Sequence, residues 1–125
     1  MTRTQTQPLK DFSVLVLEDD YYLADDARRT LEAAGAEVIG PFRDADAAFA
    51  ALDQSIPTCA LVDINLGGGP DFGPARTLAG RGVPIVFITG YDREVIPSEF
   101  RAAPCLQKPV EGHKIVSAVG GLCAR

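Results

Sequence analysis

Short apolar runs of strand length alternate along this chain with stretches of helical periodicity. The apolar runs cover residues 12–17, 37–40, 58–63, 83–89 and 104–107. Such alternation is typical of βα repeats, in which the strands form a parallel sheet. No linker interrupts the pattern, so we expect one α/β domain over residues 11–125, preceded by a flexible arm over residues 1–10.

The segments between the apolar runs predict about five helices. Four of them cover roughly residues 23–34, 44–54, 74–80 and 115–122. Asp44 is placed to cap the second helix, and Pro74 suits the first turn of the third. The segment from residue 92 to residue 103 is charged and contains Pro97, so we expect the fourth helix to be short.

The composition excludes several classes of protein. The net charge is -5 over 125 residues and no basic stripe is present, which argues against a nucleic-acid ligand. No apolar run is long enough to span a bilayer, and the first ten residues lack the apolar core of a signal peptide. Cys59, Cys105 and Cys123 show no metal-binding spacing, so we expect reduced thiols and a cytoplasmic location.

Polar side chains follow four of the five predicted strands, at the point where each strand ends. The cluster Glu18–Asp20 follows the first strand, and Asp63 ends the third. Thr89 ends the fourth strand, and Lys108 with Pro109 follows the fifth. The carboxyl ends of parallel strands meet at one edge of the sheet, where open α/β folds bind their ligands. We therefore expect these side chains to form one site.

These residue types are suited to binding a phosphoryl group. Clustered carboxylates repel one another unless a cation intervenes, and Mg²⁺ prefers oxygen ligands. Asp19, Asp63 and a main-chain carbonyl near Asn65 could supply such ligands. An aspartate can also attack phosphorus as a nucleophile, which makes Asp63 the candidate acceptor. Thr89 and Lys108 would then bind the remaining phosphoryl oxygens.

Each of these signals also has an ordinary structural explanation when it is taken alone. Asp20 is a candidate helix cap, Thr89 could simply fill a strand end, and Lys108 could be a solvated lysine. Their occurrence at consecutive strand ends of one sheet is what favours a functional site.

With these motifs, residues 12–123 resemble the receiver domain of two-component response regulators. The resemblance implies a single doubly wound α/β domain of the flavodoxin-like receiver fold, with five parallel strands in the order 2-1-3-4-5. It implies that Asp63 accepts a phosphoryl group from a histidine kinase or a histidine phosphotransfer protein. Apart from this Mg²⁺-dependent self-phosphorylation and its reversal, no enzymatic activity is expected.

The resemblance also implies a role for each residue of the site. Asp19 and Asp63 would bind Mg²⁺ directly, Asn65 through its main-chain carbonyl, and Glu18 through water. Thr89 and Lys108 would contact the phosphoryl oxygens and report the presence of the phosphoryl group. Pro109 would fix the loop after Lys108.

Two positions depart from the usual receiver pattern. Gly67 stands where receivers usually carry a proline, and Cys105 stands where they carry an aromatic switch residue. The run Phe87–Tyr91 instead resembles the "FAT GUY" motif of an atypical single-domain receiver subfamily, in which the fourth helix is short or mobile. We therefore expect Gly90 and Tyr91 to belong to the switch, with Tyr91 reporting a shift of the loop over residues 90–101.

The sequence thus favours a single-domain response regulator that signals by phosphorylation-dependent partner binding or acts as a phosphate sink. Its downstream partner is unspecified, and a homodimer remains open. The alternative is a pseudo-receiver that is never phosphorylated and serves as an interaction module. A phosphatase that uses Asp63 is disfavoured because Asn65 cannot act as a second acid. A flavin-binding module is disfavoured because no phosphate-cradling loop is evident.

Overall fold

The computed structural model describes residues 7–123, which form one five-stranded parallel sheet with helices on both faces. The sheet order is β2-β1-β3-β4-β5, as predicted. The strands are β1 (Ser13–Leu17), β2 (Glu37–Phe42), β3 (Cys59–Asp63), β4 (Ile85–Thr89) and β5 (Cys105–Gln107). The α-helices are α1 (Tyr21–Ala33), α2 (Ala45–Leu52), α3 (Gly73–Gly80) and α4 (Gly112–Cys123).

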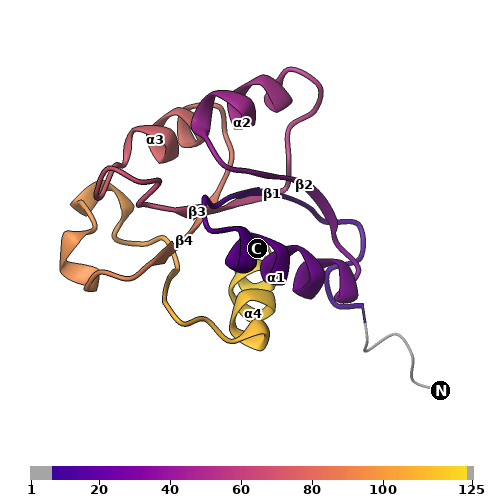
Figure 1. Cartoon of the computed structure of the whole chain (residues 1–125). Coiled ribbons are helices and arrows are strands. Elements are labelled where there is room, and N and C mark those ends of the chain that lie inside the picture. The colour runs from indigo at the N-terminus through magenta and orange to yellow at the C-terminus, as the bar shows by residue number, and fades with distance from the viewer. Residues whose placement is uncertain (1–6, 124–125) are drawn as a thin grey trace.

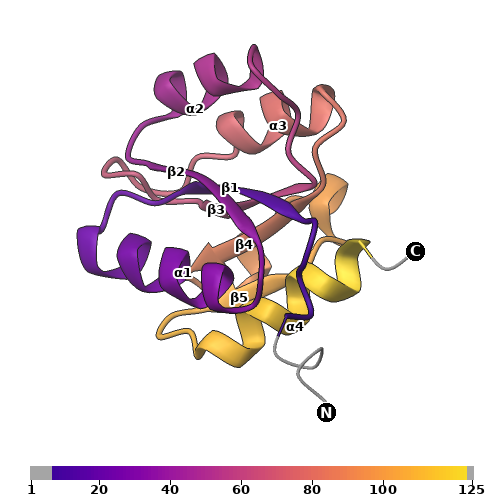
Figure 2. The same cartoon turned by 90° about the vertical axis from the view of Figure 1, so that its right-hand side faces the viewer.

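The helices divide between the two faces of the sheet. Figure 1 and Figure 2 show α2 and α3 on one face and α1 and α4 on the other. Side chains alternate along each strand, so Leu15 and Phe87 pack toward α2 and α3 whereas Val16 and Val86 pack toward α1 and α4. Because β3 and β4 are covered on both faces, they are apolar throughout and end in the buried side chains that form the site.

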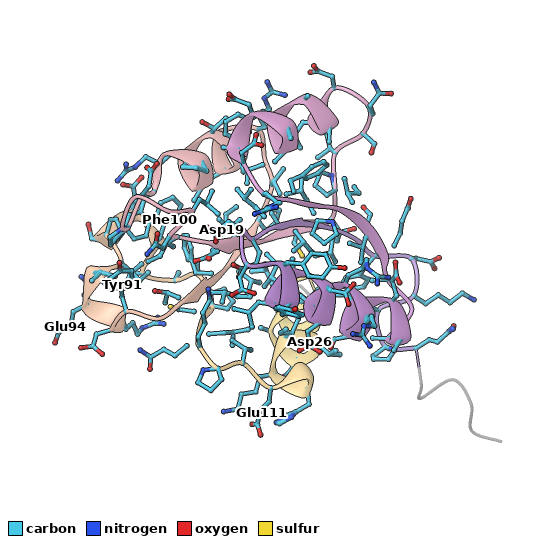
Figure 3. All side chains as sticks on the ribbon, viewed as in Figure 1. Asp19, Asp26, Tyr91, Glu94, Phe100 and Glu111 are labelled. Carbon is cyan, nitrogen blue, oxygen red and sulfur yellow. The ribbon has the colours of Figure 1, made fainter. Side chains whose placement is uncertain are left out.

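The predicted fourth helix is replaced by two single turns of 3-10 helix, η2 (Arg93–Val95) and η3 (Ser98–Phe100). The described residues therefore contain four α-helices, where about five were predicted. Pro97 separates the two turns, since it has no N–H to donate and favours extended backbone at Ile96 (φ -74°, ψ 123°). Phe100 anchors the segment through ring contacts with Phe72 and Phe87. Figure 3 shows Phe100 and Tyr91 in this segment between β4 and β5.

Strand β2 extends beyond the end predicted at Gly40 and includes Pro41. The prediction was too short because β2 lies at the edge of the sheet, where a proline is tolerated. The register with β1 shifts by one residue at this point, and Gly40 takes a positive φ of 101°. Pairing then resumes at Phe42, whose carbonyl accepts from the Glu18 N–H at 2.9 Å.

The described part of the predicted N-terminal arm, residues 7–10, contacts the rest of the domain. Leu9 is completely buried, and its N–H donates to the Ala34 carbonyl at 2.8 Å. Residues 7–10 therefore belong to the domain, and residues 1–6 lie outside the described residues. No helix within residues 7–123 is long and apolar enough to cross a membrane.

Candidate functional site

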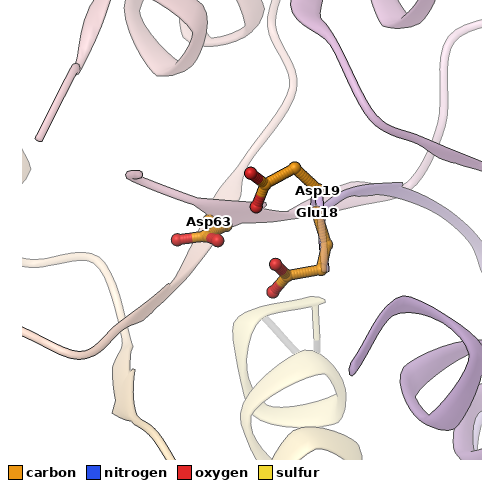
Figure 4. A group of neighbouring side chains, drawn as sticks. All are labelled: Glu18, Asp19 and Asp63. Atoms are coloured by element: carbon orange, nitrogen blue, oxygen red, sulfur yellow. The ribbon is translucent and has the colours of Figure 1, made fainter. Parts of the chain in front are cut away.

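Three carboxylates converge at the carboxyl edge of the sheet. Asp63 is the last residue of β3, while Glu18 and Asp19 follow directly after the neighbouring strand β1. One carboxylate oxygen from each residue lies within 4.8 Å of the others. Figure 4 shows the three side chains turned toward a common space from these two chain segments. The structure thus brings together the acidic residues that the strand ends predicted.

The Glu18 carboxylate is the most confined of the three. Its residue is 2% exposed, and Oε2 accepts from the Asp20 N–H at 3.1 Å. The other oxygen, Oε1, is buried and has no hydrogen-bond partner within residues 7–123. Burial, together with the neighbouring Asp63 carboxylate, raises the pKa of Glu18 from 4.5 to about 7. Lys108 and the Asp20 N–H therefore compensate the charged form of Glu18 only in part.

Lys108 supplies positive charge to the cluster from the chain segment after β5. Its Nζ lies 3.1 Å from Oδ2 of Asp63 and 3.4 Å from Oε1 of Glu18. Burial acts to lower the pKa of Lys108, but the two carboxylates outweigh it and hold the pKa above its ordinary value. One ammonium set against three carboxylates leaves the site negatively charged.

The donor set fits a hard divalent cation. Three convergent carboxylates, one with an orphaned buried oxygen, are the oxygen ligands that Mg²⁺ takes when it keeps part of its water shell. A cation there would compensate the charge that Lys108 leaves unbalanced. Glu18, Asp19 and Asp63 are the residues that would hold it.

Asp20 does not belong to the cluster. Its Oδ1 accepts from the N–H groups of Tyr22 at 2.9 Å and Leu23 at 3.1 Å, which caps α1. The prediction of Asp20 as a helix cap is confirmed, as is that of Asp44, whose Oδ1 accepts from the Ala47 N–H.

Thr89 and Lys108 come from β4 and from the segment after β5, the strands that lie beyond β3 from β1 in the sheet order. Thr89 is completely buried at the end of β4, the strand that pairs with β3. Its main-chain carbonyl accepts from the Lys108 N–H at 2.8 Å, which ties the ends of β4 and β5 together. Its hydroxyl Oγ1 accepts from the Tyr91 N–H at 2.8 Å, so the hydroxyl hydrogen stays available as a donor.

Asn65 organises the loop after Asp63 through its side chain, a role that the sequence analysis missed. Its N–H donates to Oδ1 of Asp63 at 2.9 Å. Its Oδ1 accepts from Gly67 at 2.9 Å and Gly69 at 3.2 Å, and its Nδ2 donates to the Tyr91 hydroxyl at 3.1 Å. An asparagine before consecutive glycines is a turn signal that could have indicated the first of these contacts.

Gly67 explains one departure from the receiver pattern. Its φ is +114°, a backbone conformation that proline cannot adopt. Its N–H donates a hydrogen bond to Asn65 Oδ1, which proline could not do. The usual proline is therefore incompatible with this loop.

The remaining predicted residues occupy the same edge or its surroundings. The peptide between Lys108 and Pro109 is cis, and Gly90 is exposed beside Tyr91. Cys105 is half-buried in β5, and burial raises the pKa of its thiol although Arg93 acts in the opposite direction. The thiolate is therefore disfavoured, which argues against redox reactivity.

The structure is similar to those of several known proteins. It shares 30% identity and a TM-score of 0.75 with SdrG from Sphingomonas melonis Fr1, over 93% of this chain and 98% of that one. It shares 33% identity and a TM-score of 0.77 with the signal receiver domain of a modulated diguanylate cyclase from Desulfovibrio desulfuricans G20, over 90% and 94% of the two chains. No protein-family model matches the chain, and no curated protein sequence matches it significantly.

The response regulator PhyR from Brucella abortus shares the fold at 23% identity and a TM-score of 0.79. The match covers 97% of this chain but 51% of PhyR, so this chain spans about half the length of that protein.

Proposed function

This chain belongs to the family of response regulator receiver domains, and we propose that within this family it accepts a phosphoryl group on Asp63. The observation that carries the proposal is the convergence of Asp19 and Glu18 on Asp63, with Lys108 Nζ 3.1 Å from the Asp63 carboxylate. A carboxylate that is 3% exposed and flanked by two further acidic groups is costly to bury, so a role in structure alone accounts poorly for it.

The proposed reaction is a transfer from a phosphohistidine of a histidine kinase or histidine phosphotransfer protein. A carboxylate oxygen of Asp63 attacks phosphorus, a new O–P bond forms, and the P–N bond of the donor breaks. The electron pair of that bond stays on the imidazole nitrogen, which then takes up a proton from water. Hydrolysis of the aspartyl phosphate later returns the carboxylate and releases phosphate.

The residues around Asp63 would act by positioning and by charge compensation. Mg²⁺, when bound by Glu18, Asp19 and Asp63, would supply positive charge to the phosphoryl oxygens. Lys108 would move its ion pair from the Asp63 carboxylate to a phosphoryl oxygen. The Thr89 hydroxyl would donate its free hydrogen to another while it still accepts from the Tyr91 N–H.

The wider proposal is a response regulator that signals by phosphorylation-dependent binding of a partner protein or drains phosphate from its donor, in the cytoplasm. Its phosphoacceptor chemistry would be stoichiometric rather than that of a turnover enzyme. The rival function is a pseudo-receiver that binds a partner without phosphorylation. The presence of Asp63, Thr89 and Lys108 together at the edge supports the first function over the second.

The test is incubation of the protein with a small phosphodonor and Mg²⁺, followed by intact mass spectrometry. One added phosphoryl group is expected on the wild-type protein, and none on Asp63→Asn. The matched control is Asp92→Asn, an exposed aspartate in the loop after β4, which should be modified like the wild type. Absence of any modification with small donors and with phosphorylated donor proteins would favour the pseudo-receiver.

A further inference from the structure

Tyr91 is held at three points although it lies in an irregular segment. Its N–H donates to Thr89 Oγ1 at 2.8 Å, and its carbonyl accepts from Gln107 Nε2 at 2.8 Å. Its hydroxyl accepts from Asn65 Nδ2 at 3.1 Å. The ring also packs against the core cluster on the α2 and α3 side of the sheet. Tyr91 therefore joins the ends of β4 and β5 to the loop after β3.

Asn65 is the point at which this connection reaches the acidic site. Its side-chain amide uses Nδ2 for Tyr91 and Oδ1 for the N–H groups of Gly67 and Gly69. The Asn65 N–H donates to Oδ1 of Asp63 at 2.9 Å. A loop of three glycines has high conformational entropy, so these hydrogen bonds help to fix it, together with the Asp71 N–H that donates to the Ile64 carbonyl at 2.7 Å.

We propose that Tyr91 is a positioning residue of the metal site, which acts through Asn65 to hold the loop after β3 in the form that binds Mg²⁺. This inference rests on the proposed Mg²⁺ site at Glu18, Asp19 and Asp63. Coupling between two sites is reciprocal, so Mg²⁺ binding must in turn stabilise the Tyr91 position. The cation and the segment from residue 90 to residue 101 therefore affect each other without direct contact.

The size of the effect follows from the hydrogen bond that links the two loops. One neutral hydrogen bond contributes enough net free energy to change an equilibrium constant roughly two- to tenfold. Loss of the Tyr91 hydroxyl leaves the three-glycine loop less ordered, so the cation must order it on binding. Tyr91→Phe is therefore expected to weaken Mg²⁺ binding by about two- to tenfold.

The test measures Mg²⁺ binding by isothermal titration calorimetry for the wild type, Tyr91→Phe and Tyr22→Phe. Tyr22 is 81% exposed and receives no hydrogen bond at its hydroxyl from residues 7–123, so Tyr22→Phe should bind like the wild type. Gln107→Ala removes the donor to the Tyr91 carbonyl while every carboxylate stays in place, and it should weaken binding in the same direction. A merely structural role for Tyr91 would lower the melting temperature and leave the Mg²⁺ affinity unchanged.

A second readout uses the fluorescence of Tyr91 itself. The chain has no tryptophan and three tyrosines, so the Tyr21→Phe/Tyr22→Phe variant carries Tyr91 as its sole tyrosine. Its emission should change on addition of Mg²⁺ with the same midpoint as the calorimetric titration. Because this variant keeps Tyr91, the measurement does not depend on whether Tyr91→Phe folds. Unchanged emission, or equal Mg²⁺ affinity in Tyr91→Phe and the wild type, overturns the inference and leaves the metal site standing. Absence of Mg²⁺ binding to the wild type overturns both.

Discussion

Lys108 Nζ lies 3.1 Å from Oδ2 of Asp63, although the two residues are 45 positions apart in the chain. The ion pair joins the segment after β5 to the end of β3, and Nζ also lies 3.4 Å from Glu18 Oε1. Within residues 7–123, Lys108 is the one cationic side chain at ion-pair distance from the acidic cluster. Replacement of Lys108 should therefore remove the cationic partner of two buried carboxylates, Glu18 and Asp63.

Lys108→Met should destabilise the metal-free protein, and the loss should be larger at pH 8 than at pH 5. At pH 8 the variant leaves the ionised Glu18 without its cationic neighbour, whereas at pH 5 Glu18 holds its proton. Removing one partner of a buried pair costs about 3–5 kcal/mol, and partial exposure of Lys108 reduces this to about 1–3 kcal/mol. Urea denaturation at the two pH values measures the difference.

The control for this prediction is Lys114→Met. Lys114 is exposed on α4 and pairs only loosely with Glu111, at 3.8 Å within residues 7–123. Its replacement should change the free energy of unfolding by less than about 0.5 kcal/mol at either pH. Equal losses for Lys108→Met at pH 5 and pH 8 would contradict the assigned role.

The stability of the metal-free protein should fall as the pH rises from about 5 to about 7. The native state holds the Glu18 proton up to a pKa of about 7, whereas the unfolded chain loses it near 4.5. In this window the native state binds more protons, so the free energy of unfolding decreases with rising pH. The contribution of this residue is at most on the order of 3 kcal/mol.

Glu18→Gln isolates this contribution, because the amide has the shape of the protonated acid and does not titrate. The variant should lose the decrease in stability between pH 5 and pH 7 while it keeps the dependence that other groups cause. Chemical denaturation in the presence of a chelator gives both curves. Parallel curves for the wild type and the variant would show that Glu18 titrates near its ordinary pKa.

Much of the fold could be predicted because its signals are local. Apolar runs and caps such as Asp20 and Asp44 mark the ends of elements, and parallel pairing brings the strand ends to one edge. The extension of β2 past Gly40 could not be predicted in the same way, since the tolerance for Pro41 depends on the edge position of that strand. The burial of Leu9 likewise depends on a contact with Ala34, which is distant in sequence.

The residues of the candidate site likewise divide into those that local signals predict and those that depend on packing between distant segments. Glu18, Asp19, Asp63 and Lys108 each stand at a strand end, so residue type and position indicated them together. The contact between Asn65 and Tyr91 joins positions 26 apart and depends on how two loops pack, which no periodicity records.

Asp19→Asn should weaken Mg²⁺ binding far more than Asp20→Asn. Asp19 lies in the carboxylate cluster with Glu18 and Asp63, and the loss of one carboxylate ligand should lower the affinity by at least about tenfold. Asp20 caps α1, and asparagine caps a helix about as well as aspartate, so Asp20→Asn should preserve both fold and affinity. Calorimetric titration of the two variants decides this, and a larger loss for Asp20→Asn would contradict the assigned ligand set.

Gly67→Pro should destabilise the protein even though it restores the residue that receivers usually carry at this position. The φ of Gly67 is +114°, whereas proline is held at about -65°. The Gly67 N–H also donates to Asn65 Oδ1, and proline has no N–H to replace it. Both effects together should cost about 3 kcal/mol or more, and the disturbed Asn65 side chain should also weaken Mg²⁺ binding.

Alanine at Gly67 and at Gly68 separates backbone strain from loss of the hydrogen bond. Gly67→Ala keeps the N–H but places a Cβ at positive φ, which should cost about 1 kcal/mol. Gly68 lacks that strain, and a Cβ there would meet no atom within 4 Å, so Gly68→Ala should be neutral or slightly stabilising. The free energy of unfolding should therefore decrease from Gly68→Ala to Gly67→Ala to Gly67→Pro. A Gly67→Pro protein as stable as the wild type would mean that the loop adopts the usual receiver conformation in solution.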